Sequence, residues 1–94
     1  MPNPIKTDFL QPLIVPHVNM NGTDAKKLVE QLMAAQVACE KALELLSAAT
    51  PHGRDYRDER QLRVARRAWF ERTYMLAKLS SNLTDLAVEI SKQS

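Results

Sequence analysis

The feature that most constrains how this 94-residue chain folds is a strict seven-residue repeat of large apolar side chains in its C-terminal third. The repeat comprises Leu62, Trp69, Leu76, Leu83 and Ile90. A companion series, three residues further along in each heptad, comprises Ala65, Arg72, Leu79 and Leu86. Because an apolar repeat averaging 3.5 residues is typical of helices that wind around one another, residues 58–92 are predicted to form one long helix. Such a helix needs another helix to cover its apolar stripe.

A second stretch of helical periodicity, at about residues 24–49, supplies that partner. Its apolar positions fall on two heptad series, which comprise Leu28, Ala35, Ala42 and Ala49, and Leu32, Cys39 and Leu46. Thr23 is the expected N-cap, with Asp24 as a favourable charge in the first turn. The predicted loop, residues 50–57, contains Pro51 and a glycine turn at Gly53, which end the helix. We therefore predict an all-α fold, an antiparallel two-helix hairpin.

The two predicted helices differ in length. At 1.5 Å per residue they span about 39 Å and about 52 Å, so they cannot match end to end. We expect the overhang to lie at the C-terminal end of the second helix, near residues 83–90, and to need a cover from the N-terminal arm or another subunit. Because a lone hairpin of this size buries little surface, the chain is predicted to assemble into a homo-oligomeric helical bundle.

Residues 1–22 form a segment of different composition, which holds four of the five prolines. Each proline removes a backbone donor and pushes its predecessor toward extended conformations, so the segment is predicted to be an extended arm. It is also rich in apolar side chains, namely Ile5, Phe9, Leu10, Leu13, Ile14, Val15 and Val18. The arm therefore packs either against the chain's own helices or over a neighbouring subunit, and the sequence leaves both open.

Composition and motifs exclude several classes of protein. The apolar fraction of 45% and the charged fraction of 26% are those of a folded globular chain. The single cysteine, Cys39, has no internal disulfide partner, and no stretch approaches the roughly 20 apolar residues that span a bilayer. His17, His52 and Cys39 lack metal-ligand spacing, and no catalytic triad or Gly-rich phosphate loop is present. We expect a cytoplasmic, non-enzymatic protein without cofactor, metal site or membrane contact.

The charge distribution points to an anionic partner. All seven arginines lie in residues 54–72 together with four acids, so this segment carries +3 while the rest of the chain sums to −1. Arg60, Arg63 and Arg67 share one helical face, and the planar guanidinium suits bidentate phosphate contacts. The alternative is a solvated face that the interleaved acids partly neutralise. A net charge of only +2 makes long duplex nucleic acid a poor partner, whereas a small anionic ligand fits.

One arginine, Arg72, occupies a position of the companion series between Ala65 and Leu79. A charged group placed in an apolar stripe needs a partner or a ligand. Alternatively, its stem packs on the stripe while the guanidinium reaches solvent.

A polar motif precedes the first predicted helix. It comprises His17, Asn19, Asn21, Gly22 and Thr23, with Lys26 one turn into the helix. Free backbone N–H groups and the helix dipole favour an anion at such a place. The alternative interpretation is ordinary capping, with a tight turn at Asn21-Gly22.

A second motif, in the predicted loop, joins a glycine turn to Arg54, Asp55 and Tyr56. A guanidinium, a carboxylate and an aromatic ring together suit the clamping and stacking of a base. Alternatively, Asp55 caps the second helix and Tyr56 packs across the turn. In an antiparallel hairpin the two motifs lie a full first-helix length apart, so one chain cannot bring both to one ligand. Two chains packed antiparallel would form composite sites at subunit boundaries.

The order of these motifs resembles that of a group of short phage and prophage proteins with His-x-Asn-Gly-Thr and Asn-Gly-Arg-Asp-Tyr patterns. The resemblance covers about residues 17–90. The chain departs from the patterns at Met20, which adds one residue to the first motif, and at His52, where asparagine is expected. Small helical phage proteins of this size include nucleotide sponges, which bind cyclic-nucleotide immune signals without cleaving them. By analogy of size and class, the resemblance implies a function of that kind.

We therefore predict a non-catalytic phage-encoded protein that sequesters a small nucleotide signal, of the cyclic oligonucleotide or cyclic ADP-ribose type, in an infected bacterium and so counters host antiphage defence. The expected ligand-binding residues are His17, Asn19, Asn21, Gly22, Thr23, Lys26, Arg54, Asp55, Tyr56, Arg67 and Arg72. Tyr56 is expected to stack on a base, and Arg54 and Arg72 to bind phosphates. The alternative is an adaptor or inhibitor whose arginine-rich face docks on an acidic host protein.

Overall fold

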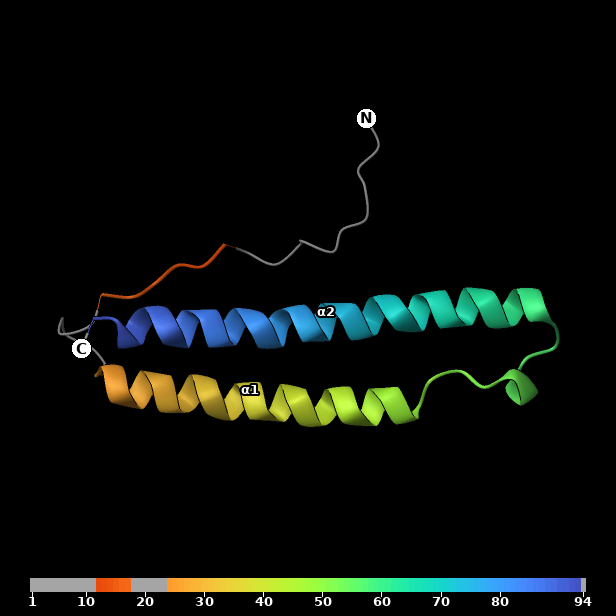
Figure 1. The fold of residues 1–94 in the computed structure, drawn as a ribbon, viewed down its shortest axis with the longest axis horizontal. Coiled ribbons are helices and arrows are strands. Elements are labelled where there is room, and N and C mark those ends of the chain that lie inside the picture. The colour runs from red at the N-terminus through yellow and green to blue at the C-terminus, as the bar shows by residue number, and fades with distance from the viewer. Residues whose placement is uncertain (1–11, 18–23, 94) are drawn as a thin grey trace, which may run out of the picture.

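Two antiparallel helices make up most of the molecule (Figure 1). The computed structural model of the chain describes residues 12–17 and 24–93. In chain order, α1 spans Ala25–Ala48, the short 3-10 helix η1 spans Gly53–Asp55, and α2 spans Glu59–Ser91. The described residues contain no strand. The predicted all-α hairpin is confirmed, and each predicted end of the two long helices lies one residue from the observed end.

An aspartate begins each long helix. Asp24 and Asp58 have extended backbones, and the carboxylate of each accepts a 2.9 Å hydrogen bond from the backbone N–H three residues on. This contact satisfies one of the backbone donors that a helix start leaves without a partner. The prediction of Thr23 as the first N-cap was therefore wrong by one residue, because the helix starts at Ala25. Asp55 does not cap α2, because it is the last residue of η1 and Asp58 holds the cap position.

The end of α1 combines local and tertiary caps. The backbone N–H of Ala49 donates to the carbonyls of Leu45 and Leu46, and the Thr50 hydroxyl donates to the Ser47 carbonyl at 2.7 Å. The indole Nε1–H of Trp69 reaches across from α2 and donates to the Leu46 carbonyl at 2.8 Å. The last carbonyls of a helix lack partners within it, so the Trp69 contact ties the end of α1 to α2.

The large apolar repeat of α2 lies in the seam between the helices, as predicted. Leu62, Trp69, Leu76 and Leu83 are half-buried, and Ile90 is only 1% exposed. In the companion series, Ala65 and Leu86 are half-buried, but the prediction was wrong for Arg72 and Leu79, which are exposed. The seam instead takes the positions four residues after each large side chain, namely Thr73, Ser80 and Ala87. Residues four apart lie on the same helical face, and these small side chains let the helices approach closely.

The stripe on α1 shifts in the same way. Leu32, Cys39 and Leu46 are half-buried, as predicted. Ala35 and Ala49 are exposed, so the prediction of them as seam residues was wrong. Their places are taken by Val29, Gln36 and Leu43. Gln36 is polar, but its amide donates to the buried Ser80 hydroxyl at 3.1 Å, and that hydroxyl donates to Glu40 at 2.9 Å. A satisfied polar group belongs in a seam, which an apolar count alone does not reveal.

The two helices are aligned at the open end of the hairpin, where α1 begins and α2 ends (Figure 1). The prediction of an overhang of the second helix near residues 83–90 was therefore wrong, and Ala87 and Ile90 are buried at this end. The extra length of α2 lies at the closed end instead, where the connector between the helices extends beyond α1. Pro51 is buried in that connector, and its carbonyl accepts a 3.3 Å hydrogen bond from Arg66 Nε. The connector therefore takes up the length difference.

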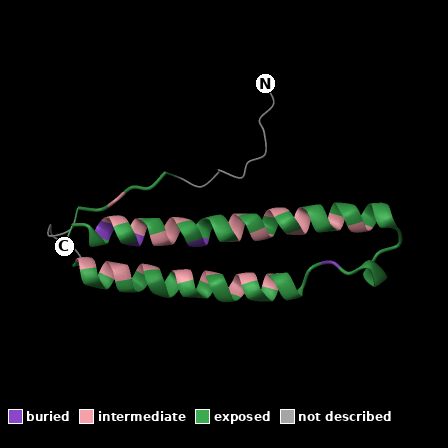
Figure 2. Ribbon diagram, viewed as in Figure 1, coloured by how far each residue is buried: buried purple, intermediate pink, exposed green. Residues whose placement is uncertain are grey.

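The core of the single chain is thin (Figure 2). Among the described residues, Ala87 and Ile90 are the buried hydrophobic side chains, and Ser80 is the buried polar one. Residues 12–17 form neither helix nor strand, and the Gln93 amide donates to the Pro16 carbonyl at 2.8 Å. Of the apolar arm residues, Leu13 and Ile14 are exposed and Val15 is half-buried, while Ile5, Phe9, Leu10 and Val18 lie outside the described residues.

Candidate functional site

An open pocket of about 550 Å³ lies at the closed end of the hairpin. Its lining residues are Tyr56, Asp58, Arg60, Gln61, Val64 and Ala65. The size falls within the range of small-molecule sites, and the lining mixes apolar groups with a few polar ones. The pocket therefore joins one residue of the predicted loop motif to the first two turns of α2.

Local hydrogen bonds hold the loop that carries Tyr56. His52 Nδ1 accepts a 3.3 Å bond from the Arg54 N–H, and the Tyr56 N–H donates to the Gly53 carbonyl at 3.2 Å. A Cβ added at Gly53 would lie 3.6 Å from the Leu62 side chain, so the turn packs directly on α2. On the far side of Tyr56, the Arg57 N–H donates to the Gln61 side chain at 3.2 Å. Tyr56 is thus held between two anchored turns with its ring partly exposed.

The charge at the closed end is largely unpaired. Arg54, Arg57, Arg60 and Arg63 are exposed and make no ion pair with any described residue. Arg67 lies 4.0 Å from Glu71, and an exposed pair at that distance contributes little. The cationic groups around the pocket are therefore free to bind an anion.

Two predicted ligand residues do not reach this pocket. The Arg72 guanidinium lies 5.6 Å from the centre of the Trp69 ring, so its partner within the chain is this aromatic ring. Arg67 and Arg72 are five residues apart, which places them about 140° apart around α2. Within one chain they do not converge on one ligand with Arg54, so their role in ligand binding stays a prediction for sites shared between chains.

Of the polar motif before α1, the structure describes His17 and Lys26, and both are exposed. Asn19, Asn21, Gly22 and Thr23 lie outside the described residues. The 24 residues of α1 separate the start of that helix from the loop motif by about 36 Å. Lys26 is therefore far from the loop motif within one chain.

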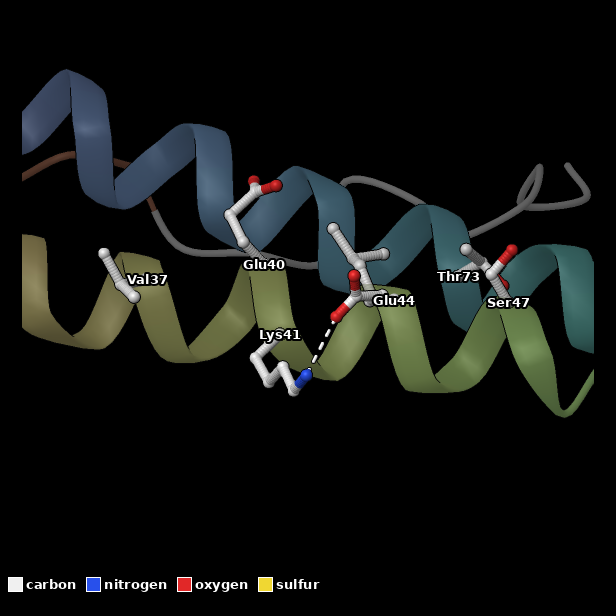
Figure 3. A pocket seen from close by; sticks show the side chains of 7 residues that line it. Val37, Glu40, Lys41, Glu44, Ser47 and Thr73 are labelled. Carbon is white, nitrogen blue, oxygen red and sulfur yellow. Dashed lines mark hydrogen bonds and ion pairs between the residues drawn. The ribbon is translucent and has the colours of Figure 1, made fainter.

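Two further grooves lie along the seam. One of about 670 Å³ is lined by Val37, Glu40, Lys41, Leu43, Glu44, Ser47 and Thr73 (Figure 3). An ion pair of 3.0 Å joins Lys41 and Glu44 on its wall, and the two acids make it a poor place for an anion. The other, of about 420 Å³, is lined by Val29, Met33, Thr84, Ala87, Val88, Ser91 and Lys92.

Sequence reasoning missed the contribution of Gln61 and Val64 to the closed-end pocket and assigned Arg60 only to a general basic face. The sequence contained a signal for this group, because Val64 lies four residues after Arg60 and three after Gln61, and residues at these spacings share one side of a helix. What hid it was the connector, whose path decides which side of α2 Tyr56 meets.

No group of His, Cys, Asp or Glu within residues 12–17 and 24–93 has the arrangement of a metal site. Neither helix in the same part of the chain has an apolar stretch long enough to cross a membrane. Comparison with known proteins returns no match to a family model, a curated protein or a solved structure. The resemblance to short phage proteins stays a prediction.

Proposed function

We propose that this chain is a non-catalytic protein that binds a small anionic nucleotide at the closed end of the hairpin. The observation that carries the proposal is the pocket in which Tyr56 and Arg60 stand together. An exposed tyrosine ring offers a stacking surface for a base, and an unpaired guanidinium offers two parallel donors to a phosphate. Arg54 and Arg57 flank the pocket along the chain and add positive potential around it.

The proposed active form is a homo-oligomer. The start of α1, which follows the polar motif in the sequence, and the Tyr56 pocket lie at opposite ends of one chain, about 36 Å apart. A second chain packed antiparallel would place its own α1 start beside that pocket. The resulting site would combine Tyr56 and Arg60 of one chain with the first-motif residues of the other, twice per symmetric dimer.

The biological setting that we propose follows from the sequence resemblance. A protein that binds a cyclic oligonucleotide or cyclic ADP-ribose without cleaving it would lower the free concentration of a host immune signal. Such a protein needs stoichiometric binding and no catalytic group. Binding of this kind in the cytoplasm of an infected bacterium would let a phage evade a nucleotide-triggered defence.

The first test is native mass spectrometry of the purified chain with a panel of cyclic di- and trinucleotides and cyclic ADP-ribose isomers. We expect a defined oligomer that gains one nucleotide per pocket, with the mass of the nucleotide unchanged. Uptake of none of these compounds would refute the proposal. Cleaved nucleotide would refute its non-catalytic part.

Matched variants locate the site. Tyr56→Ala removes the stacking ring, and Arg60→Ala removes the guanidinium that donates hydrogen bonds to the phosphate. Each substitution is expected to weaken binding at least about tenfold. Tyr56→Phe keeps the ring and is expected to retain most of the affinity. Lys78→Ala removes one positive charge from an exposed position of α2 outside the pocket, and it controls for net charge. Equal losses in Arg60→Ala and Lys78→Ala, with no loss in Tyr56→Ala, would assign binding to overall charge rather than to this pocket.

A second candidate function is favoured by the outer surface of α2. Arg60, Arg63 and Arg67 are exposed on it, and among the described residues only Arg67 of the three forms an ion pair, with Glu71. Such a surface suits docking on an acidic host protein, with rim charges that speed association. A chain that binds no nucleotide but binds an acidic protein in a salt-sensitive way would favour this second function.

A further inference from the structure

We propose that a second copy of this chain docks on the Phe70 face, the side of the hairpin formed by Met33, Val37, Phe70, Tyr74 and Val88. Each of these residues directly follows a seam residue, so each lies about 100° around its helix from the seam. In two antiparallel helices that rotation leads to the same side of the pair. The two seam grooves agree, since one brings Val37 beside Thr73 and the other brings Met33 beside Val88.

The five side chains of the Phe70 face are exposed in the single chain, and charged Glu40, Lys41 and Glu44 line the groove beside Val37 on the same side. Phe70 is 68% exposed and Val37 is 62% exposed, and the other three residues are exposed too. The rings of Phe70 and Tyr74 stack with their centroids 6.5 Å apart, which fixes them as one flat surface. Together the five side chains expose roughly 500 Å² of mostly apolar area, at the upper end of the patches found on monomers. The surrounding polar rim brings the face close to the roughly 800 Å² per partner of a stable interface.

The occupant that fits is a second copy, because the single chain leaves its own fold incompletely buried. It exposes 7329 Å², against about 5,500 Å² for a compact protein of its 10.7 kDa mass. The two-helix shape and the extended segment before α1 account for the excess. Hairpins of this kind become four-helix bundles by pairing, and pairing covers the Phe70 face of both copies at once.

The spacing of the apolar residues selects an antiparallel arrangement. The Gln36–Ser80 hydrogen bond sets these two residues at one level, so Val37 is level with Leu79. Leu79 is also the midpoint between Phe70 and Val88. A two-fold axis across the face at this level therefore places Phe70 of each copy against Val88 of the other, and the two Val37 side chains at the axis.

Charge favours the same arrangement. Residues 54–72 carry +3 at the closed end of each copy. A parallel pair would bring two such segments side by side, whereas the antiparallel pair puts them at opposite ends of the bundle. The closed end of each copy then lies beside the open end of its partner. This interface deepens the proposed function, on which its role in a composite nucleotide site rests, but the docking itself is argued from the Phe70 face alone.

Sedimentation velocity without nucleotide, over a range of protein concentrations, tests the docking. We expect a dimer for the wild type, and at least a hundredfold weaker association for Phe70→Glu and Val37→Glu, which bury a charge in the interface. The control is Leu45→Glu. Leu45 is 59% exposed and lies two positions after the seam residue Leu43, pointing away from the partner helix. A monomeric wild type, or equal loss of association in all three variants, would overturn the proposal.

A second measurement needs no interface variant. A spin label at Arg57→Cys in a Cys39→Ser background is expected to give a distance of about 60 Å between the two copies, because the start of α2 lies about 30 Å from the two-fold axis. A parallel dimer would bring the two labels within about 20 Å and would overturn the antiparallel arrangement. Because neither measurement uses a ligand, a dimer that binds no nucleotide would refute the proposed nucleotide binding and leave the docking standing. A monomer that binds nucleotide would refute the docking and the composite site, but not nucleotide binding at the Tyr56 pocket.

Discussion

The contact that most directly joins the two helices is also the one whose energetic contribution can be separated into parts. Trp69 packs in the seam, and its indole N–H donates to the Leu46 carbonyl at 2.8 Å near the end of α1. Trp69→Phe keeps an aromatic ring in the seam but removes the donor. Trp69→Ala removes both. Comparing the two variants therefore separates the hydrogen bond from the packing.

The expected magnitudes follow from these two roles. A neutral intramolecular hydrogen bond contributes about 1 kcal/mol net, and the Leu46 carbonyl that loses it stays near solvent, so Trp69→Phe is expected to lower the free energy of unfolding by about 1 kcal/mol. Truncating a tryptophan to alanine costs about 3–5 kcal/mol when the ring is fully buried. Since Trp69 is only half-buried, we expect about 3 kcal/mol for Trp69→Ala.

Thermal unfolding followed by circular dichroism at 222 nm is the suitable assay, because Trp69 is the only tryptophan and its fluorescence disappears with the substitution. For a domain of this size, 1 kcal/mol corresponds to roughly 4–8 °C in Tm. All variants must be compared at one protein concentration, since self-association would make Tm depend on it.

Arg72→Ala is the control for the ring contact on the solvent side of Trp69. The stacking distance of 5.6 Å and the exposed guanidinium predict a loss of about 0.5 kcal/mol. If Trp69→Phe melts within a degree of the wild type, the bond to Leu46 does not stabilise the hairpin. If Trp69→Phe is as damaging as Trp69→Ala, the packing term has been misjudged, and the seam depends on the indole itself.

Three further substitutions test other parts of the hairpin. Asp58→Ala removes the N-cap of α2 and is expected to cost about 1 kcal/mol in urea denaturation, whereas Asp58→Asn, which can still accept the bond, is expected to cost less than half as much. Ser80→Ala removes the hydroxyl shared by Gln36 and Glu40 and is expected to cost about 1 kcal/mol, because those two side chains can still pair with each other at 3.2 Å. Ile90→Ala, at the best buried position, is expected to cost about 2–4 kcal/mol, and equal stability to the wild type would show that the open end is not the core.

The elements of the fold were largely predictable because they are specified locally. The proline that ends α1 and the large side chains of the 62–90 repeat are visible in a single sequence. The capping aspartates, Asp24 and Asp58, were not identified as caps, although the predicted helix starts lay within one residue of the observed ones. The second half of each stripe was not. An apolar repeat can be completed three or four residues further on, and counting apolar residues selected the wrong series in both helices. The correct series includes Gln36 and Ser80, whose burial depends on a hydrogen bond between helices that no local pattern shows.

The same error explains why the candidate site was only partly predicted. Arg72 attracted a functional interpretation because it was assigned to the seam, and in the fold it is exposed over Trp69. The loop residue Tyr56 was identified from local chemistry, and it does line a pocket. Its partners in that pocket were not identified, since they depend on how the connector takes up the extra length of α2. Local chemistry therefore found a residue of the site, and the tertiary path of the connector determined its neighbours.

The choice of small residues in the seam also accounts for the surface that we assign to a second copy. Thr73 and Ala87 let α2 lie close to α1, and the bulky side chain that follows each of them, Tyr74 or Val88, is left outside the seam. A helix pair built this way is narrow and keeps Phe70 and Tyr74 on one side, the Phe70 face. Exchanging the order of small and large residues would thicken the hairpin core and remove the Phe70 face. The pattern therefore favours association over a self-sufficient monomer, and it places the Phe70 face in the middle of the hairpin and the unpaired arginines at its closed end.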